Sequence, residues 1–233
     1  MRKRQAVSPD PEAKEPLDID EVFGRLREVV RELPKAAMFE LRDRGFGTPF
    51  EQLVGSLISA RTRDETTLEV CLRLFAEART PAQMASLGEE QLCSLLRGAS
   101  FPEPKARDIL AISQAIKTEL GGRVPDTLEG LTAFRGIGPK IAALTLAVGF
   151  GRPVIAVDTH VHRVTNRWGY VATRTPEQTM AALAAKLPER YWIEINERLV
   201  PFGKWICTGV APPRCSTCLV LSMCRQVGVV KHR

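Results

Sequence analysis

Four cysteines near the C-terminus have a spacing that can hold a metal centre. The pattern C-x7-C-x2-C-x5-C is formed by Cys207, Cys215, Cys218 and Cys224. Thiolates this close along the chain can surround one centre without ligands from elsewhere. Structural zinc sites usually combine two close cysteine pairs, and only one such pair occurs here, so the spacing favours a 4Fe-4S cluster and leaves zinc open. A structural role for the cluster is as compatible with the sequence as a redox role.

The same part of the chain is basic. From Pro201 onward the sequence contains five Lys or Arg residues and no Asp or Glu, in a chain whose net charge is +6. Such a segment suits a surface that faces phosphate, and Arg214, directly before the second cysteine, is the candidate contact. A solvated face that binds nothing is the alternative.

A second pattern is the segment Phe134–Ala142, which reads FRGIGPKIA. Gly136 and Gly138 permit positive φ and close backbone approach, and the helix that follows presents free N–H groups to an anion. The pattern predicts a helix-turn-helix hairpin that could cradle phosphate, although ordinary hairpins share it. Lys140 is placed at the edge of the helix face formed by Ile141, Leu144 and Val148.

A third pattern is the segment Ala156–Arg163, which reads AVDTHVHR. Asp158 follows the apolar, strand-like run Val154–Val157 and is placed to cap a helix, a role compatible with catalysis. His160 and His162 are two residues apart and so fall on different helix faces, which argues against a shared metal ion.

The elements that must position these residues are helical. Thr48, Thr80 and Thr175 each precede a proline and have Glu or Gln three residues later, which is the capping-box pattern. Helical periodicity follows from Glu65 and again from Ile109. We therefore predict an all-α protein.

Length and composition exclude several classes. A chain of 233 residues with 44% hydrophobic and 26% charged residues is typical of a globular protein. The longest uncharged apolar run is too short to cross a membrane, and the N-terminus lacks a signal-peptide pattern. We expect a cytoplasmic protein with a mobile tail at residues 1–17, and Cys71 and Cys93 in the core.

Taken in this order, hairpin, aspartate and four cysteines resemble the endonuclease III family of DNA glycosylases. The segments Thr48–Glu51, Leu57–Ala60 and Lys105–Ile109 also resemble family helices. The resemblance implies a six-helix barrel domain over 42–152 with the helix-hairpin-helix motif at 127–149. It also implies an iron-sulfur domain built from 18–41 and 153–233, with a DNA cleft between the two.

The resemblance also implies the chemistry. Lys140 would attack the sugar of an extruded nucleotide and form a Schiff base, which leads to β-elimination. The amine must be neutral, so we expect partial burial and the positive helix end to favour its uncharged form. Asp158 would stabilise the cationic sugar. The four cysteines would bind the cluster. The expected DNA contacts are Arg61, Phe101, Arg135, Gly136, Ile137, Gly138, His160 and Arg214.

The implied function is a bifunctional glycosylase and AP lyase that removes oxidised pyrimidines in base excision repair. Its partner would be double-stranded DNA with damaged pyrimidines or abasic sites. We expect a monomer that is associated with a bacterial nucleoid and not with a membrane.

The sequence departs from the family at several positions. The first cysteine gap is seven residues instead of six. Arg135 and Pro139 replace a proline and a polar residue, which affects the expected affinity for phosphate. Arg61 stands where the family has glutamine, and it can still fill the space of a flipped base. The loop Ala99–Pro104 offers Phe101 either as a wedge between bases or as a residue packed under the loop.

Two other functions remain possible from the sequence. A monofunctional adenine-type or mismatch glycosylase is opposed by Lys140 and by the mere nine residues after Cys224. A non-catalytic DNA-binding protein would have no use for the combination of Lys140 and Asp158.

Overall fold

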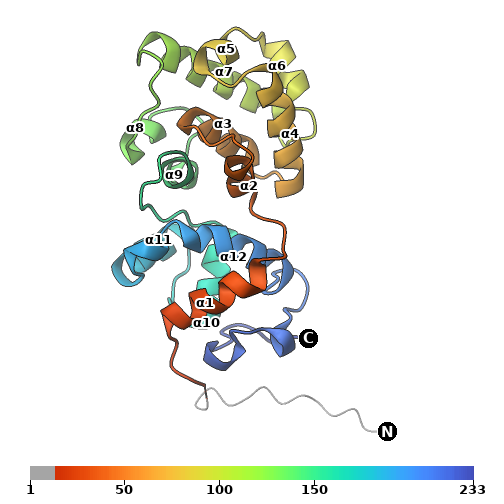
Figure 1. The fold of residues 1–233 in the computed structure, drawn as a ribbon, viewed down its shortest axis with the longest axis vertical. Helices are drawn as coiled ribbons and strands as arrows, with labels where there is room; N and C mark the ends of the chain where they lie inside the picture. Colours follow the sequence, from red (N-terminus) through yellow and green to blue (C-terminus); the bar gives the residue numbers. More distant parts are fainter. Residues whose placement is uncertain (1–13) are drawn as a thin grey trace. The chain divides into compact units, whose positions relative to one another are not determined.

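The computed structural model describes residues 14–233, and within this range it contains helices and no β-strand (Figure 1). The α-helices are α1 (Ile19–Val30), α2 (Ala37–Asp43), α3 (Pro49–Ser59), α4 (Asp64–Glu77), α5 (Pro81–Ala85), α6 (Glu89–Leu95), α7 (Pro102–Thr118), α8 (Leu128–Thr132), α9 (Pro139–Leu144), α10 (Thr159–Trp168), α11 (Pro176–Lys186) and α12 (Glu194–Trp205). The shorter turns are the π-helical η2 (Thr145–Gly149) and the 3-10 helices η3 (Glu189–Tyr191), η4 (Cys215–Thr217) and η5 (Leu221–Met223). The predicted all-α class is confirmed.

The run Val154–Val157, which resembles a strand in sequence, is extended but unpaired in the described part of the chain. None of the described helices is both long enough and apolar enough to span a bilayer.

The chain divides into two compact units. One contains the described residues up to Pro34 together with Val157–Leu187 and Arg198–Arg233, and the other contains Lys35–Ala156 and Pro188–Glu197. The boundaries differ from the sequence-based ones, because 35–41, 153–156 and 188–197 belong to the larger unit. The assignment of these units as barrel and cluster domains stays a prediction.

Helix α3 forms the centre of the larger unit. Every residue from Phe50 to Ile58 is buried, and the helix contacts α2, α4, α7, α9 and η2. A helix that is buried on all sides is typical of the core of a domain. Its start is fixed by Thr48, whose Oγ1 accepts from the Glu51 amide in a complete capping box. The Glu51 carboxylate is in turn paired with Arg79 at 2.6 Å.

The hairpin follows from α8 through α9 into η2. The Thr127 side chain caps α8, and Ile141 and Leu144 are buried as the stripe predicted. The helix continues into the π-helical turn η2, where a Cβ on Gly149 would lie 2.9 Å from the Pro49 Cα. Only glycine permits this close approach of η2 to the start of α3.

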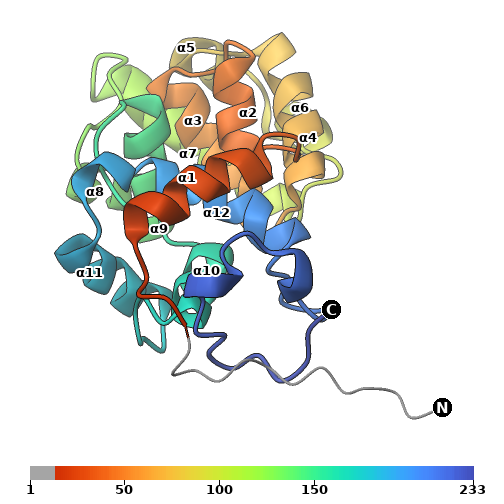
Figure 2. The same ribbon diagram turned by 60° about the horizontal axis from the view of Figure 1, so that its bottom comes forward.

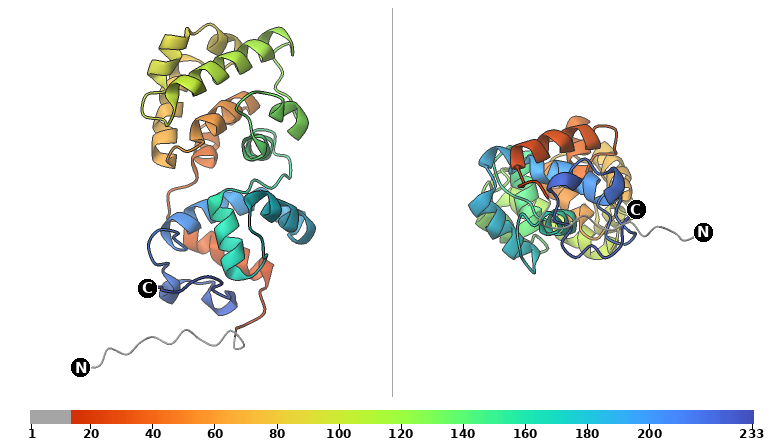
Figure 3. Two further views of the ribbon diagram at one scale, coloured as in Figure 1. Left: turned by 180° about the vertical axis from the view of Figure 1, so that it is seen from behind. Right: turned by 90° about the horizontal axis from the view of Figure 1, so that it is seen from below.

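Helix α7 packs along α5 and α6 (Figure 3, left panel). The sequence predicts a loop over Ala99–Pro104. The helix already begins at Pro102, so residues 102–104 belong to α7. Its inner face carries Ile109, Ile112 and Ile116, all buried. This packing fixes the position of Lys105 one turn earlier.

The smaller unit joins the N-terminal helix to the C-terminal segment. Arg25 of α1 donates to the Leu219 carbonyl at 2.7 Å and to the Ser222 hydroxyl at 3.2 Å, and Figure 2 shows the segment beside α1. Lys14 also donates to the Leu221 carbonyl. The Glu15 amide donates to the Ser222 carbonyl, so the predicted tail 1–17 is wrong for residues 14 and 15, while residues 1–13 lie outside the described part.

The three helix starts predicted from threonine caps are confirmed. Thr48, Thr80 and Thr175 each accept a hydrogen bond from the amide three residues later. Cys71 is fully buried as expected. Cys93 is only partly buried, because the short helix α6 turns Leu92 and Leu96 toward the core and leaves the next position at the edge of that face.

Candidate functional site

The turn of the hairpin is held by an acidic residue from α7. Gly136 has φ +83°, and a Cβ at this position would lie 2.7 Å from the Asp108 carboxylate. Arg135 pairs with the same carboxylate at 3.1 Å. The amide of Ile137 donates to the Phe134 carbonyl, and the Ile137 side chain is buried. Asp108 thus fixes the turn, and Ile137 anchors it to the core.

Lys140 is the second residue of α9 and lies on the surface. The expectation of partial burial is therefore wrong. Residues 141–148 are buried on every side of the helix, whereas Pro139 and Lys140 in its first turn are exposed. The amine is thus open to a ligand.

Asp158 caps α10 as the sequence predicts. Its Oδ1 accepts from the His160 amide at 2.9 Å and from the Val161 amide at 2.8 Å. The preceding residues Ile155, Ala156 and Val157 are buried and anchor the approach to the helix. The carboxylate is half-buried at the positive end of α10, where negative charge is favoured.

His160 and Arg163 form a contact on α10. The Arg163 guanidinium lies 3.1 Å from His160 Nδ1 and donates to the Gly203 carbonyl at 2.8 Å. It also donates to the Cys207 carbonyl at 3.2 Å. Burial lowers the pKa of Arg163 from its usual value. Through Arg163, the start of α10 contacts the first of the four cysteines.

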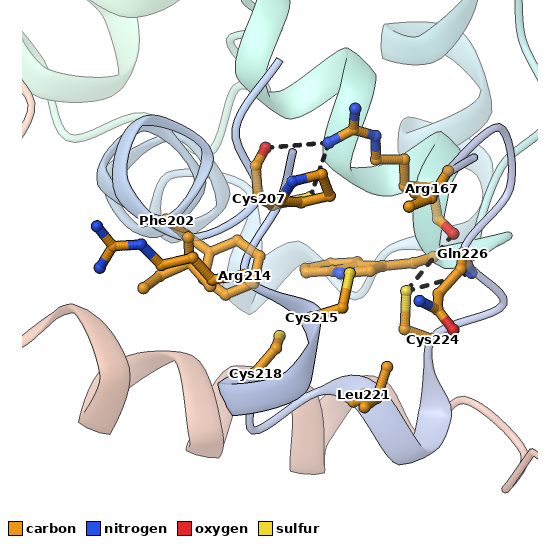
Figure 4. Close-up of a pocket in the computed structure, with 13 residues that line it drawn as sticks. Arg167, Phe202, Cys207, Arg214, Cys215, Cys218, Leu221, Cys224 and Gln226 are labelled. Carbon is orange, nitrogen blue, oxygen red and sulfur yellow. Dashed lines mark hydrogen bonds between the residues drawn. The ribbon is translucent and has the colours of Figure 1, made fainter. Parts of the chain in front are cut away.

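The four cysteines line one pocket. Figure 4 shows all four among the residues that line this pocket. The pocket is also lined by the apolar side chains of Trp168, Phe202 and Leu221. No group of three His, Cys, Asp or Glu side chains between residues 14 and 233 is arranged as a complete site for a metal ion. The four predicted ligands therefore line one pocket, and their role as metal ligands stays a prediction.

The chemistry of this donor set fits a metal centre. Burial raises the pKa of the Cys218 thiol to about 11 and that of Cys224 to about 12. The four thiols lie in a largely apolar pocket, and a metal that bound them would displace their protons. The backbone amide of Gln226, which has a left-handed φ of 53°, lies 3.4 Å from the Cys224 sulfur.

Arg167 reaches the pocket from α10. Its guanidinium donates to the Cys207 Sγ at 3.4 Å, to the Cys207 carbonyl at 3.3 Å and to the Thr208 carbonyl at 2.7 Å. It supplies positive charge beside thiolates that carry negative charge once a metal is bound. Arg214 also lines the pocket with part of its side chain, but its residue is exposed and its amide donates to the Ile206 carbonyl.

Arg61 and Phe101 lie side by side on two loops of the larger unit. The Arg61 guanidinium is 6.0 Å from the centre of the Phe101 ring. The Phe101 side chain is 56% exposed, which excludes a residue packed under its loop. Both residues have φ +57°, a conformation that costs on the order of 1–3 kcal/mol in a residue other than glycine.

Three basic residues were not predicted as parts of these sites: Arg163 and Arg167 near Cys207, and Lys105 near Arg61. Arg163 and Arg167 are one helical turn apart on α10, a spacing that places them on one face, but nothing in the sequence indicates that Cys207 lies opposite. Lys105 is buried although it carries a charged group. The position of this lysine within an apolar helix face is the sequence signal that could have indicated its burial.

Comparison with known proteins assigns the chain to a superfamily. The model of the HhH-GPD superfamily of base excision DNA repair proteins matches residues 54–189. Endonuclease III of Thermotoga maritima is 41% identical over 212 residues, which cover 89% of this chain and 96% of that protein. Endonuclease III of Escherichia coli is 31% identical over 179 residues, which cover 77% of this chain and 84% of that protein.

Solved structures agree with these relatives. A non-covalent endonuclease III–DNA complex superposes with a TM-score of 0.77 at 27% identity and covers 89% of this chain and 94% of that one. A trapped covalent endonuclease III–DNA intermediate gives a TM-score of 0.73 at 28% identity, with 90% and 97% covered. With its hairpin, its helix-capping aspartate and its cysteine-lined pocket, the chain belongs to the endonuclease III family.

Proposed function

We propose that this chain is a bifunctional DNA glycosylase and AP lyase that excises oxidised pyrimidines from duplex DNA in base excision repair. The observation that carries the proposal is an exposed lysine two residues after Gly138 of the hairpin turn, in a member of this family. Relatives crystallised on DNA, one of them covalently trapped, support a covalent step.

Lys140 is the proposed nucleophile. Its neutral amine attacks C1′ of an extruded nucleotide, the C1′–N bond breaks, and the base leaves with the bonding electrons and takes up a proton. Opening of the sugar transfers the amine proton to O4′ and forms a Schiff base. Loss of a C2′ proton then expels the 3′ phosphate and cleaves the strand.

Asp158 is the proposed electrostatic partner of this reaction. A carboxylate stabilises positive charge that develops on the sugar as the base departs. Its two amide hydrogen bonds hold the carboxylate at a fixed position. Capping of α10 and catalysis are thus compatible duties of one side chain.

The remaining predicted residues are proposed DNA contacts. Gly136 and Gly138 let the hairpin backbone approach a phosphate closely, with Ile137 as the buried anchor between them. Arg135 and Arg214 are exposed cations that suit phosphate, and His160 lies beside the proposed catalytic carboxylate. Arg61 and Phe101 are proposed to enter the base stack.

A 4Fe-4S cluster is the proposed occupant of the cysteine-lined pocket. Cys207, Cys215, Cys218 and Cys224 would bind its irons, and Arg167 would offset its negative charge. The single close cysteine pair, Cys215 and Cys218, favours the cluster over a single Zn²⁺, since structural zinc sites usually combine two such pairs. The cluster would stabilise the fold of the basic segment that carries Arg214, without taking part in the bond-breaking steps.

The proposed partner is double-stranded DNA that contains damaged pyrimidines or abasic sites. We propose that the chain acts on it as a monomer, at the nucleoid.

Borohydride trapping tests the function directly. Wild-type protein incubated with duplex DNA that carries one oxidised pyrimidine should form a stable covalent adduct, and Lys140→Gln should not. Lys117→Gln, an exposed lysine on α7, is the matched control and should trap normally. Base release without an adduct would favour a monofunctional glycosylase. Binding without base release would favour a non-catalytic protein.

Metal analysis tests the cluster. About four irons and four sulfides per chain, with a brown colour, are expected for a 4Fe-4S centre. One zinc per chain and no sulfide would contradict the cluster and show that the pocket binds zinc.

A further inference from the structure

Lys105 is a buried amine with an unusual set of partners. The residue is 6% exposed, and its Nζ donates to the Ile58 carbonyl at 2.6 Å, to the Ala60 carbonyl at 2.8 Å and to the Thr62 hydroxyl at 3.1 Å. All three acceptors are uncharged. An ammonium has three N–H groups, and here each one has an acceptor.

These acceptors lie at residues 58–62, which comprise the end of α3 and the turn that follows it. The turn carries Arg61, which has a left-handed φ of 57°. A protonated lysine that binds the carbonyls on both sides of Ser59 fixes the backbone that leads into Arg61. A residue other than glycine persists in this conformation only where its surroundings hold it there.

The same turn also fixes the loop that carries Phe101. The Ser100 amide donates to the Thr62 hydroxyl at 3.1 Å, and the Ser100 hydroxyl donates to the Arg61 carbonyl at 2.7 Å. Thr62 Oγ1 therefore accepts from both Lys105 and Ser100. Phe101, the next residue, is the second left-handed position.

These hydrogen bonds hold the backbone of both loops beneath two exposed side chains, Arg61 and Phe101. The Arg61 guanidinium lies against the Phe101 ring, and both side chains are open to solvent. Lys105 lies beneath the turn and contacts neither side chain through a hydrogen bond. Its burial lowers the pKa of Lys105 to about 8, so the fold places this charge where it is disfavoured.

We propose that Lys105 is a positioning residue that holds Arg61 and Phe101 together as one pre-arranged wedge, which enters the base stack when the damaged nucleotide is extruded. The inference rests on the proposed function, because it assigns a cause to the geometry of two proposed DNA contacts. A wedge that is ordered before binding does not have to be ordered at the moment of extrusion.

Two variants test the inference. Lys105→Met keeps the apolar stem and removes all three donors, and Lys117→Met on the exposed face of α7 is its matched control. Thr62→Val is nearly isosteric and removes the shared acceptor. If Lys105→Met does not fold, as judged by circular dichroism, Thr62→Val carries the test alone.

The informative readouts separate extrusion from chemistry. We expect Lys105→Met to slow single-turnover excision from duplex DNA about tenfold or more, since small displacements of positioned groups have effects of this size. The fluorescence increase of a 2-aminopurine beside the lesion should slow equally, because it reports unstacking. Cleavage of a single-stranded abasic oligonucleotide needs no wedge and should stay within about twofold of wild type. Thr62→Val should show the same pattern at smaller size.

A double-mutant cycle distinguishes positioning from general destabilisation. In an Arg61→Ala, Phe101→Ala background, Lys105→Met (or Thr62→Val) should slow excision no further, because the wedge is already absent. Additive losses, or equal losses on the single-stranded substrate, would overturn the inference. So would wild-type excision by both variants. A wild-type chain that neither excises nor cleaves would instead overturn the proposed function.

Discussion

The carboxylate of Asp158 accepts a hydrogen bond from the backbone amide of Val161 at 2.8 Å. The same oxygen also accepts from the His160 amide, so one atom completes the cap of α10. Capping requires only an acceptor, whereas stabilisation of a cationic sugar requires a negative charge. The two duties of Asp158 can therefore be separated by substitution.

Asp158→Asn is expected to keep the cap and lose the charge. Asn and Asp are equally good N-caps, so the free energy of unfolding should change by less than about 0.5 kcal/mol. Excision should fall by a factor on the order of 10² or more, as for other groups that act in the transition state. Denaturant unfolding and single-turnover kinetics measure the two effects.

Asp158→Ala serves as the control for capping. It should destabilise the protein by about 1 kcal/mol because both amides lose their acceptor. An Asn variant with wild-type excision would show that the charge at this position has no part in the reaction.

The caps are the part of the fold that the sequence predicts best. A threonine followed by proline and then by glutamate or glutamine specifies a helix start within four residues, so Thr48 and Thr80 could be read locally. The exposure of Lys140 could not, because the sequence does not show where along the helix the packing begins: residues 141–148 are buried on every side, and Pro139 and Lys140 lie outside that packing.

Arg167→Met is expected to weaken retention of the metal centre. The substitution removes the donor to the Cys207 sulfur and to two backbone carbonyls, which leaves the bound thiolate without a nearby positive charge. Iron release to a chelator should be faster by about tenfold. Arg174→Met, on an exposed arginine before α11, is the matched control. Equal release rates for both variants would remove Arg167 from this role.

Arg214→Ala is expected to weaken binding to DNA uniformly across sequences. If the exposed guanidinium contacts one phosphate, the slope of log K against log salt should fall by about 0.9. Fluorescence anisotropy at several salt concentrations provides the slope. A slope identical to that of wild type would place Arg214 outside the interface.

Lys105 should make stability depend on pH in a defined direction. Its pKa is lowered by burial from 10.5 to about 8, so between these values the unfolded chain holds a proton that the folded chain has released. The contribution of Lys105 to the free energy of unfolding must then rise as the pH increases from 8 to 10. The difference between wild type and Lys105→Met, measured by urea unfolding, should increase over this range. A constant or falling difference would contradict the lowered pKa.

Contacts that bridge distant parts of the chain explain what the sequence alone could not provide. Lys105 binds carbonyls that lie 45 and 47 residues earlier, and Arg167 binds Cys207 across 40 residues. The cysteine spacing was readable because the four ligands lie in one short segment. The arginine that approaches them from α10 was not, since its partner is set by packing of the smaller unit.

Peptide mapping of the borohydride-trapped adduct tests the central claim most directly. After digestion, mass spectrometry should place the reduced DNA remnant on Lys140, in wild-type protein that has excised the damaged base. A remnant on another lysine or on the N-terminal amine, with Lys140 unmodified, would contradict the account.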